Sequence, residues 1–453
     1  MKRWIVAFAG LLCVLGPGAL YSFSLMSAPL TAAFGWTAPS VTWAFAIANL
    51  FLAIGGLVGG VLSDRVGPRP IAVTGIILWG AGYAACSTLA QSHSLFLLYL
   101  FYGVIAGFGA GMAYISCLAT VLRWFPNRRG FGGGLVIMGF GLGSFVYNAI
   151  VKQTSAFAAI SSNTAAYNKA QTSALADHVP FDVAKYAMDP ANVAALMSLF
   201  LYSGIAMIVV GVLTAFFVTR PSAEMLAASE GETADTPQFT LAATLADARF
   251  YVLWAMLFLN VFGGITVLSN MVPIMHELMG HQHDFTGAMS PDPTGIFAFL
   301  AVFNGLGRLF WGWLSDRISR RVTFAIVLGS QALAFFILDG GSKDLTFVSI
   351  GVGILLFCYG GGFGVMPAFN ADFFGTKHFG ANYGAQLSAW GLAAIAGVYF
   401  TGVMKSLSGT FVGLMQPVSI MLLVAILLPI IIETPKKTKK TEKLVNAAAP
   451  VAA

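Results

Sequence analysis

Residues 60–69 read GVLSDRVGPR, and residues 312–321 read GWLSDRISRR. The two stretches share the pattern G-x-L-S-D-R and a final R, and Asp64 and Asp316 stand 252 positions apart. Self-similarity at one fixed spacing is typical of duplicated architectures. In a chain of 453 residues, this repeat predicts two equivalent halves that each carry one copy of the motif.

The composition around the two motifs is that of a membrane protein. The chain is 58% hydrophobic and 9% charged, whereas soluble domains carry about 25% charged residues. The net charge of +6 does not indicate a nucleic-acid partner, because the basic residues stand in short loops and a tail. The four cysteines lie in apolar stretches without metal-ligand spacing, so we expect neither a metal site nor a cofactor.

Twelve apolar stretches are long enough to cross a bilayer, taking about 20 residues as the requirement. We therefore predict an all-α membrane protein with twelve transmembrane helices in two six-helix pseudo-repeats. The stretches are 4–31, 41–63, 70–90, 95–122, 131–151, 191–218, 250–278, 294–314, 322–340, 345–368, 381–404 and 411–433.

Two interruptions of the apolar pattern divide the chain into domains. Residues 1–218 form a first six-helix bundle, and we interpret its outer insert at 152–190 as a loosely ordered loop or a short helical cap. Residues 219–249 are polar and acidic and form a central loop before the second six-helix bundle at 250–433. A basic cytoplasmic tail follows at 434–453.

The placement of Lys and Arg predicts the orientation, because cytoplasmic loops carry an excess of these residues. Most of the 24 Lys and Arg residues stand at one end of the predicted bundle, in the first residues, in alternate loops and in the tail. We therefore expect a multi-pass, monomeric protein of a bacterial-type inner (plasma) membrane with both termini in the cytoplasm.

The two motif loops are candidate gating elements on the cytoplasmic side. An aspartate there can cap or pair at the end of a neighbouring helix. We expect the loops to act as a latch that breaks when the inward gate opens. The candidate gating residues are Asp64, Arg65, Arg69, Asp316 and Arg317.

Arg308 is the charged residue that the pattern places well inside a predicted span. An unpaired cation there costs about 2.5–3.5 kcal/mol on insertion scales, and an arriving anion would offset this cost. Asn304 stands four positions earlier, so the two side chains share a helix face. The guanidinium is a planar fork of donors that matches a carboxylate. The alternative is that Arg308 snorkels to the cytoplasmic surface.

Four aromatic residues are further candidates for the binding site. Tyr21 follows residues 16–18, a Gly-Pro-Gly sequence where we expect the first helix to kink. Tyr359 precedes three glycines at 360–362, where we expect broken helix geometry. Each tyrosine could donate to a carboxylate or could simply pack, whereas Trp390 would shape the cavity. The four candidates are Tyr21, Tyr114, Tyr359 and Trp390.

Side chains that could bind a metal or carry a proton are scarce. His281, His283 and Asp284 could bind a metal, but we interpret them as part of a solvated loop. No Asp, Glu or His stands clearly in the middle of a predicted span. Exchange of one anion for another needs no titrating residue, whereas proton symport could use a protonated substrate or Arg308 itself. Both modes stay open, and exchange is the preferred interpretation.

These residues resemble the major facilitator superfamily over about 5–433. Within it, the chain is similar to the oxalate/formate antiporter family, which is related to the monocarboxylate transporters. The segments that carry the resemblance are the motif at 60–69, RWFPNRRG at 123–130, NGLGRLFWGWLSDR at 304–317, and FNADFFGTK at 369–377 with Asn382, Tyr383 and Gly384.

The resemblance implies a transporter that works by alternating access, not an enzyme. In that family an arginine of helix 8 binds the substrate carboxylate, and Arg308 matches it. An oxalate-transporting member has a lysine where this chain has Trp390, and animal monocarboxylate carriers have an acid where it has Asn304. The implied substrates are formate, lactate, pyruvate or oxalate, and the single charge favours monocarboxylates.

Three other functions stay as alternatives. A transporter-like sensor would bind an anion without moving it. A membrane-embedded enzyme would need an intramembrane nucleophile, acid pair or metal site, and the sequence does not display one. A drug exporter would usually place an acid in the cavity. The expected partners are a small carboxylate anion, a proton in the symport alternative, and the lipid bilayer.

Overall fold

The computed structural model is described over residues 1–176, 187–222, 224, 237–269, 274, 277–278, 293–340, 344–410 and 412–433. Regular secondary structure in these ranges is entirely helical. Eleven of the described helical segments are long and apolar enough to cross a membrane, and α15 (Pro293–Ser315) is a further long helix between two of them. The predicted all-α fold is confirmed, and these segments correspond to the twelve predicted stretches.

The first half holds six crossing segments and one additional helix, α9. Three of these crossings are divided into consecutive helical pieces, and a short 3-10 turn leads into the fifth. The elements are α1 (Lys2–Gly18), η1 (Ala19–Ser22), α2 (Phe23–Phe34), α3 (Ala38–Val66), α4 (Pro68–Ala85), η2 (Cys86–Thr88), α5 (Leu89–Ser92), α6 (Leu95–Leu98), η3 (Tyr99–Ala106), α7 (Gly107–Trp124), η4 (Pro126–Arg128), α8 (Arg129–Val151), α9 (Ser155–Ala176) and α10 (Pro190–Ala215).

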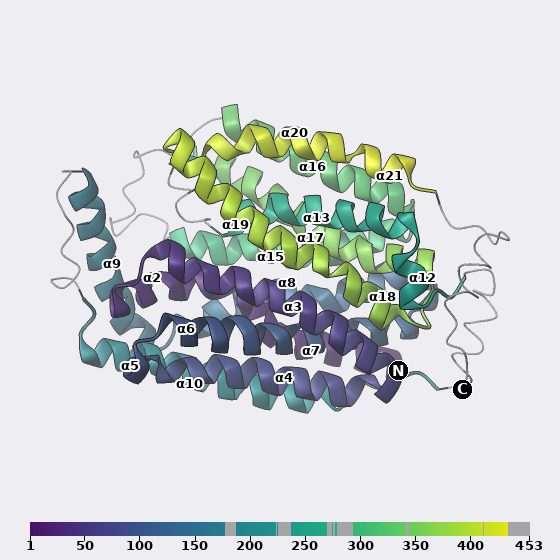
Figure 1. Cartoon of the computed structure of the whole chain (residues 1–453), viewed down its shortest axis with the longest axis horizontal. Coiled ribbons are helices and arrows are strands. Elements are labelled where there is room, and N and C mark those ends of the chain that lie inside the picture. Colours follow the sequence, from purple (N-terminus) through teal and green to yellow (C-terminus); the bar gives the residue numbers. More distant parts are fainter. Residues whose placement is uncertain are drawn as a thin grey trace.

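The second half packs against the first along the length of the bundle, as the green and yellow helices do against the purple and blue ones in Figure 1. The short helix α12 (Leu241–Leu245) precedes it. Its other elements are α13 (Ala248–Leu268), α15, α16 (Arg320–Gly340), α17 (Leu345–Phe374), α18 (Phe379–Gln386), α19 (Ser388–Ser408), η6 (Val412–Leu414), α20 (Met415–Ala425) and α21 (Leu427–Ile431).

The prediction of a broken helix at residues 360–362 is wrong, because these residues lie within the continuous 30-residue helix α17. The glycines there serve close packing against α15. A Cβ on Gly360 would lie 2.1 Å from the carbonyl oxygen of Asn304, and a Cβ on Gly364 would lie 2.2 Å from that of Arg308. The close packing of α15 against α17, which places Arg308, therefore depends on glycine, because glycine has no side chain to hold the two backbones apart.

The two halves nearly touch at one end of the bundle. A Cβ on Gly60 of α3 would lie 1.9 Å from the carbonyl oxygen of Gly380 in α18, and a Cβ on Gly130 of α8 would lie 2.1 Å from that of Gly312 in α15. These two contacts involve both copies of the motif. We call this end of the bundle the motif end, and the opposite one the far end.

A cavity lies between the two halves at the far end. Its volume is ≈ 560 Å³, and it lies between the first turns of α3, including Pro39 and Trp43, and the last turns of α19, including Tyr399 and Gly402. Helices α3 and α19 belong to different halves. The described contacts between the halves are therefore close at the motif end, whereas a cavity separates α3 from α19 at the far end.

Candidate functional site

Arg308 on α15 is 0% exposed and is directed towards the first half. Its Nε donates to Oδ1 of Asn304, one turn earlier on the same helix, at 3.2 Å. Nη1 donates to the carbonyl oxygen of Ile137 on α8 at 3.3 Å, and Nη2 donates to the hydroxyl of Tyr21 at 3.4 Å. The guanidinium thus bridges the two halves. It does not extend to the cytoplasmic surface, as the snorkelling alternative would require.

Aromatic rings from both halves surround this guanidinium. Its Cζ lies 4.7 Å from the ring centre of Phe363 on α17, 5.4 Å from that of Phe140 on α8 and 6.0 Å from that of Tyr21. The faces of aromatic rings attract cations through their quadrupoles. They also exclude water, so the charge lies in a medium of low dielectric constant.

The charge of Arg308 has no acidic counterpart in the described part of the chain. Its hydrogen-bond acceptors there are an amide, a carbonyl and a hydroxyl, and none of the described ion pairs includes it. Neutral dipoles and ring faces offset only part of the cost of burying a cation. The site therefore favours an anionic ligand.

Tyr21 joins the halves through a break in the first crossing. Pro17 lacks an N–H group, α1 ends at Gly18, and Tyr21 lies in the 3-10 turn η1, so the helix changes geometry where the kink was predicted. The Tyr21 hydroxyl lies 2.8 Å from the hydroxyl of Tyr359 on α17. This hydrogen bond connects the two halves directly beside Arg308.

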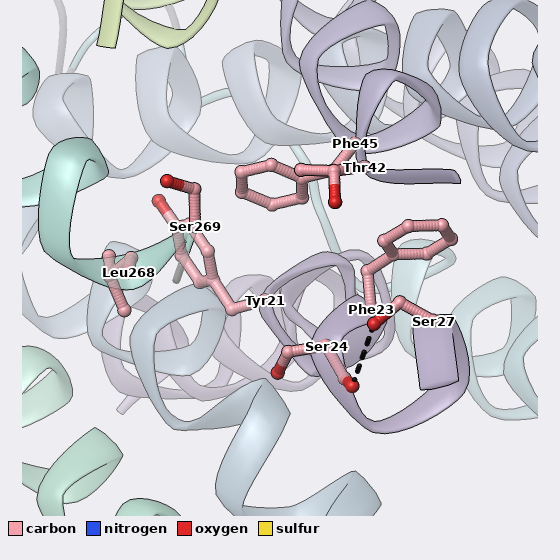
Figure 2. A pocket seen from close by; sticks show the side chains of 8 residues that line it. All are labelled: Tyr21, Phe23, Ser24, Ser27, Thr42, Phe45, Leu268 and Ser269. Carbon is pink, nitrogen blue, oxygen red and sulfur yellow. Dashed lines mark hydrogen bonds between the residues drawn. The ribbon is translucent and has the colours of Figure 1, made fainter. Parts of the chain in front are cut away.

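A small polar pocket lies on the far-end side of Tyr21 (Figure 2). Its volume of ≈ 20 Å³ leaves room for about one water molecule. Hydroxyl groups supply most of the polar lining. The serine and threonine residues around it are Ser24, Ser27, Thr42 and Ser269. This pocket therefore leaves a water-sized space on the far-end side of Tyr21.

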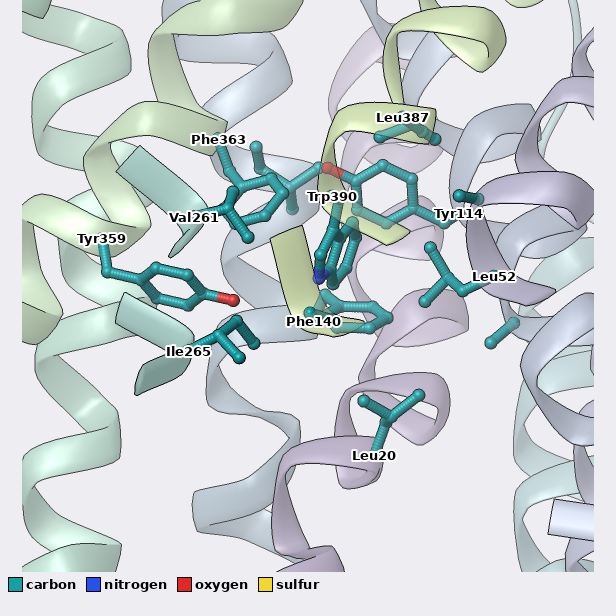
Figure 3. Packing of buried hydrophobic residues seen from close by; sticks show 14 of the residues in the cluster. Leu20, Leu52, Tyr114, Phe140, Val261, Ile265, Tyr359, Phe363, Leu387 and Trp390 are labelled. Carbon is teal, nitrogen blue, oxygen red and sulfur yellow. The ribbon is translucent and has the colours of Figure 1, made fainter. Parts of the chain in front are cut away.

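Trp390 forms a wall of the site. Its ring lies among those of Phe363, Phe140 and Tyr114, with centre-to-centre distances of 4.6, 5.4 and 5.8 Å (Figure 3). The indole Nε1 of Trp390 and the hydroxyl of Tyr114 are buried and make no hydrogen bond within the described part of the chain. Neither group contacts Arg308, so both shape the space around it instead of holding the cation.

Asp64 connects the halves at the motif end. Its Oδ1 accepts a hydrogen bond from Arg123 of the first half at 2.7 Å, and its Oδ2 accepts one from the backbone N–H of Ala381, near the start of α18, at 3.0 Å. Arg123 also donates to the carbonyl oxygen of Thr376 at 3.2 Å. A carboxylate at a helix N-terminus satisfies unpaired N–H groups and interacts favourably with the helix dipole.

Asp316 makes the equivalent connection in the opposite direction. Its two carboxylate oxygens accept hydrogen bonds from the backbone N–H groups of Gly130 and Phe131, at the start of α8, at 2.9 and 2.7 Å. Each motif aspartate therefore caps a helix of the other half. We call the Asp64 contacts and the Asp316 contacts the two latches.

Residues that the sequence analysis did not select complete the latches. Arg320 lies 2.7 Å from Asp316 and 2.9 Å from Asp372, and Arg129 lies 3.0 Å from Asp372. Arg123 and Arg129 stand in RWFPNRRG at 123–130, and the density of arginine in that short loop was the available signal. The residues that pair with these arginines are distant in sequence, so they are identified only from the packing of the helices.

The three motif arginines selected from the sequence lie outside the latches. Arg65 and Arg69 are exposed and make no ion pair within the described part of the chain. Arg317 is exposed too, and its Cζ lies 4.0 Å from the ring centre of Trp313 on its own helix. The structure thus joins the halves through the two aspartates and not through these three arginines.

The remaining titratable candidates do not add a charge to the site. Burial lowers the pKa of His378, between α17 and α18, although nearby Asp64 opposes the shift. This histidine is therefore neutral at neutral pH. No group of described residues has three or more side chains able to hold a metal. The metal candidates His281, His283 and Asp284 lie outside the described residues.

Two helical halves that enclose a buried site are the architecture of a membrane transporter. The chain matches the family model for the Major Facilitator Superfamily over residues 6–163, 191–338 and 288–453. It belongs to this superfamily. Solved structures with the same fold include a double-tryptophan mutant of XylE, with a TM-score of 0.66 and 14% identity over 98% of both chains. The E. coli fucose:proton symporter FucP has a TM-score of 0.57, 14% identity and covers 93% of this chain and 97% of its own.

Among curated relatives, the chain is 26% identical to the oxalate:formate antiporter of Oxalobacter formigenes, covering 90% of this chain and 86% of the relative. It is 24% identical to apicoplast pyruvate carrier 1 of Toxoplasma gondii, covering 88% and 77%. Monocarboxylate transporter 13 of Rattus norvegicus is 35% identical over 130 residues, 29% of this chain and 30% of the relative. The protein is therefore a multi-pass membrane transporter and not an enzyme.

Proposed function

We propose that this transporter carries small carboxylate anions by alternating access and that Arg308 binds the carboxylate. The observation that carries the proposal is a fully buried guanidinium between the halves with only neutral acceptors among the described residues. The drug-exporter alternative is disfavoured, because a site for cations would place an acid where Arg308 stands.

The chemistry of the site fits a carboxylate. An arginine fork can donate two parallel hydrogen bonds to the two carboxylate oxygens. Nη1 and Nη2 of Arg308 now make bonds of 3.3 and 3.4 Å, which are long for an N–H···O hydrogen bond and are readily exchanged for stronger ones to an anion. The names of the relatives from O. formigenes, T. gondii and R. norvegicus also refer to carboxylates or their carriers.

The contacts at the two ends of the bundle suggest how access alternates. The latches and the close glycine contacts hold the motif end shut, while a cavity separates α3 from α19 at the far end. The Tyr21–Tyr359 hydrogen bond then separates Arg308 from the far end. An anion entering from the far end would open this bond, reach Arg308, and leave at the motif end after both latches break.

The orientation follows from the charges. The motif end carries Arg65, Arg69, Arg317, Arg320 and Arg321, and cytoplasmic loops are enriched in such residues. We place the motif end in the cytoplasm and the protein in a bacterial plasma membrane. The latches then close the site from the cytoplasm.

The single charge suits monocarboxylates such as formate, lactate or pyruvate. Trp390 occupies the wall near Arg308, 4.6 Å from the Phe363 ring, and supplies apolar surface but no second cation. A second carboxylate in this position would be buried without a partner, at a cost of several kcal/mol. Oxalate is therefore expected to bind more weakly than formate or lactate.

Trp390→Lys is expected to raise the affinity for oxalate relative to formate by roughly tenfold, because it would place an ammonium where the dianion needs a second partner. Competition of unlabelled oxalate and formate against labelled formate uptake measures the ratio. Trp390→Phe is the matched control, since it keeps the aromatic wall without a charge. An unchanged ratio in Trp390→Lys would remove Trp390 from the site.

The mode of transport that we favour is exchange of one carboxylate for another. Within the described part of the chain, no acid or histidine contacts Arg308 to carry a proton. Returning an empty, unpaired Arg308 through the closed state would cost about 2.5–3.5 kcal/mol. In exchange, an anion is bound to Arg308 during both the inward and the outward step, so this cost does not arise. The alternative is proton-coupled monocarboxylate symport with a protonated substrate.

Uptake of labelled formate, lactate and oxalate into proteoliposomes tests the proposed function. We expect uptake only when the vesicles are preloaded with a carboxylate, and we expect little change when a pH gradient is imposed. Uptake into empty vesicles that an acidic exterior drives would establish symport instead. No uptake of any of the three, from protein that is inserted and folded, would contradict carboxylate transport.

A further inference from the structure

Four uncharged polar residues lie beside Arg308 or on its motif-end side. We propose that they form a second, charge-free station, which takes the carboxylate from Arg308 and passes it to the motif-end side. They are Tyr114, Asn370, Tyr383 and Gln386. This inference rests on the proposed function, because it concerns the route of the same anion.

The polar atoms of these side chains are buried without full hydrogen bonds. Asn370 and Gln386 are 0% exposed, and neither amide nitrogen nor amide oxygen of either has a partner in the described part of the chain. The hydroxyls of Tyr114 and Tyr383 are equally buried and lie near each other without the geometry of a full hydrogen bond. Each unpaired buried group costs about 1–3 kcal/mol.

Another pair of buried amides in the second half is hydrogen-bonded, in contrast to Asn370 and Gln386. Nδ2 of Asn260 on α13 donates to Oε1 of Gln331 on α16 at 2.9 Å, and Nε2 of Gln331 donates back to the carbonyl oxygen of Asn260 at 3.2 Å. The Asn260–Gln331 pair thus joins two helices of one half through two hydrogen bonds, although Oδ1 of Asn260 has no partner in the described part of the chain. The amides of Asn370 and Gln386 would lack hydrogen bonds in this state if their partners bind at another stage of the transport cycle.

The helix periodicity places the unpaired groups on the route. Asn370 stands seven residues after Phe363 on α17, so it shares the face that contacts Arg308, about 10 Å nearer the motif end. Gln386 and Tyr383 stand four and seven residues before Trp390, on the α18 side of the junction at Leu387. Both lie on the motif-end side of the Trp390 wall.

The chemistry of the station suits release. Amide N–H and phenol O–H groups donate to a carboxylate, but they lack the positive charge with which a guanidinium attracts the anion. An anion held by Arg308 would meet weaker donors before it meets water. When the latches break, the faces that carry these groups separate and become hydrated, which supplies the partners that the closed state lacks.

Cysteine accessibility in the full chain in lipid nanodiscs tests the station. The starting protein has the four native cysteines replaced by alanine, and carries Asn370→Cys or Gln386→Cys. Labelling by a water-soluble methanethiosulfonate is compared with and without Asp64→Ala, which opens one latch. The matched control is Gln331→Cys, a buried and hydrogen-bonded amide of the same half.

We expect Asp64→Ala to speed labelling at positions 370 and 386 by about tenfold, within the range of typical coupling between two states. Saturating formate should slow it, and Gln331→Cys should stay unlabelled. Labelling as slow as that of Gln331→Cys would mean that these residues are fixed packing, and labelling that formate does not slow would mean a water path without an anion station. Either result overturns the proposal.

Exchange kinetics separate this proposal from the proposed function. Asn370→Leu should slow formate exchange by about tenfold and leave the equilibrium affinity at Arg308 within about twofold, because it removes a later station and not the first. If the parent protein exchanges no carboxylate, the proposed function fails whatever the labelling shows. If the parent exchanges formate and Asn370→Leu is unchanged, only the inner station fails.

Discussion

Replacement of Arg308 by lysine is expected to abolish carboxylate exchange although the positive charge is kept. Lysine offers a compact ammonium in place of the planar fork that reaches Asn304, Ile137 and Tyr21. Hydrogen bonds to charged groups contribute about 1.5–3 kcal/mol each. Losing two of them predicts a fall in apparent affinity of roughly 100-fold or more. Arg308→Gln, which loses the charge as well, should be inactive.

Counterflow of labelled formate into preloaded proteoliposomes measures this effect. Arg3→Lys is a suitable control, because Arg3 is an exposed arginine at the start of α1 and far from the site. The variants must be shown to insert and to elute as folded protein. Exchange at normal affinity in Arg308→Lys would mean that the guanidinium packs the halves together without binding substrate.

Removal of either latch aspartate is expected to open the motif end. In Asp64→Ala, the start of α18 loses its cap and Arg123 loses its carboxylate partner. In Asp316→Ala, α8 loses its cap and Arg320 keeps Asp372 as its ion-pair partner. A lost helix cap alone costs about 0.5–2 kcal/mol. The ratio of motif-closed to motif-open protein should therefore fall by roughly 2- to 30-fold per latch.

Distances between spin labels at Arg69→Cys in the first half and Ile318→Cys in the second measure this shift, since both positions are exposed. We expect a second, longer distance to become populated in each alanine variant and to dominate in the double variant. Arg65→Ala is the matched control from the same motif, because Arg65 makes no described ion pair. A distance distribution that does not respond to Asp64→Ala and Asp316→Ala would show that the latches do not hold the state.

The sequence predicted the helices and the duplication because both depend on local patterns. Apolar length defined the crossings, and the repeated G-x-L-S-D-R marked equivalent ends of the two halves. The Gly-Pro-Gly at residues 16–18 predicted the interruption before Tyr21, since proline and glycine act on the local backbone. Three glycines at 360–362 did not break α17, because helix neighbours decide whether such a run bends or packs.

The contacts of the site depended on how the halves cross, which local patterns do not encode. The four-residue spacing placed Asn304 and Arg308 on one helix face, and the structure joins them by a hydrogen bond. Phe140 and Phe363, which cover the guanidinium, looked like any other aromatic residues in apolar helices. Arg65, Arg69 and Arg317 were natural partners for the motif aspartates in sequence. Instead, both aspartates cap helix starts of the opposite half, and among the motif arginines Arg320 pairs with Asp316.

Direct binding of a carboxylate to purified protein tests the central claim. Titration calorimetry with formate and lactate requires no transport cycle and no assumption about coupling. We predict saturable binding by the wild-type chain, with Arg3→Lys unchanged and with no measurable heat for Arg308→Gln at the same concentrations. Equal binding by wild type and Arg308→Gln would contradict the account, because the carboxylate would then be held by other residues.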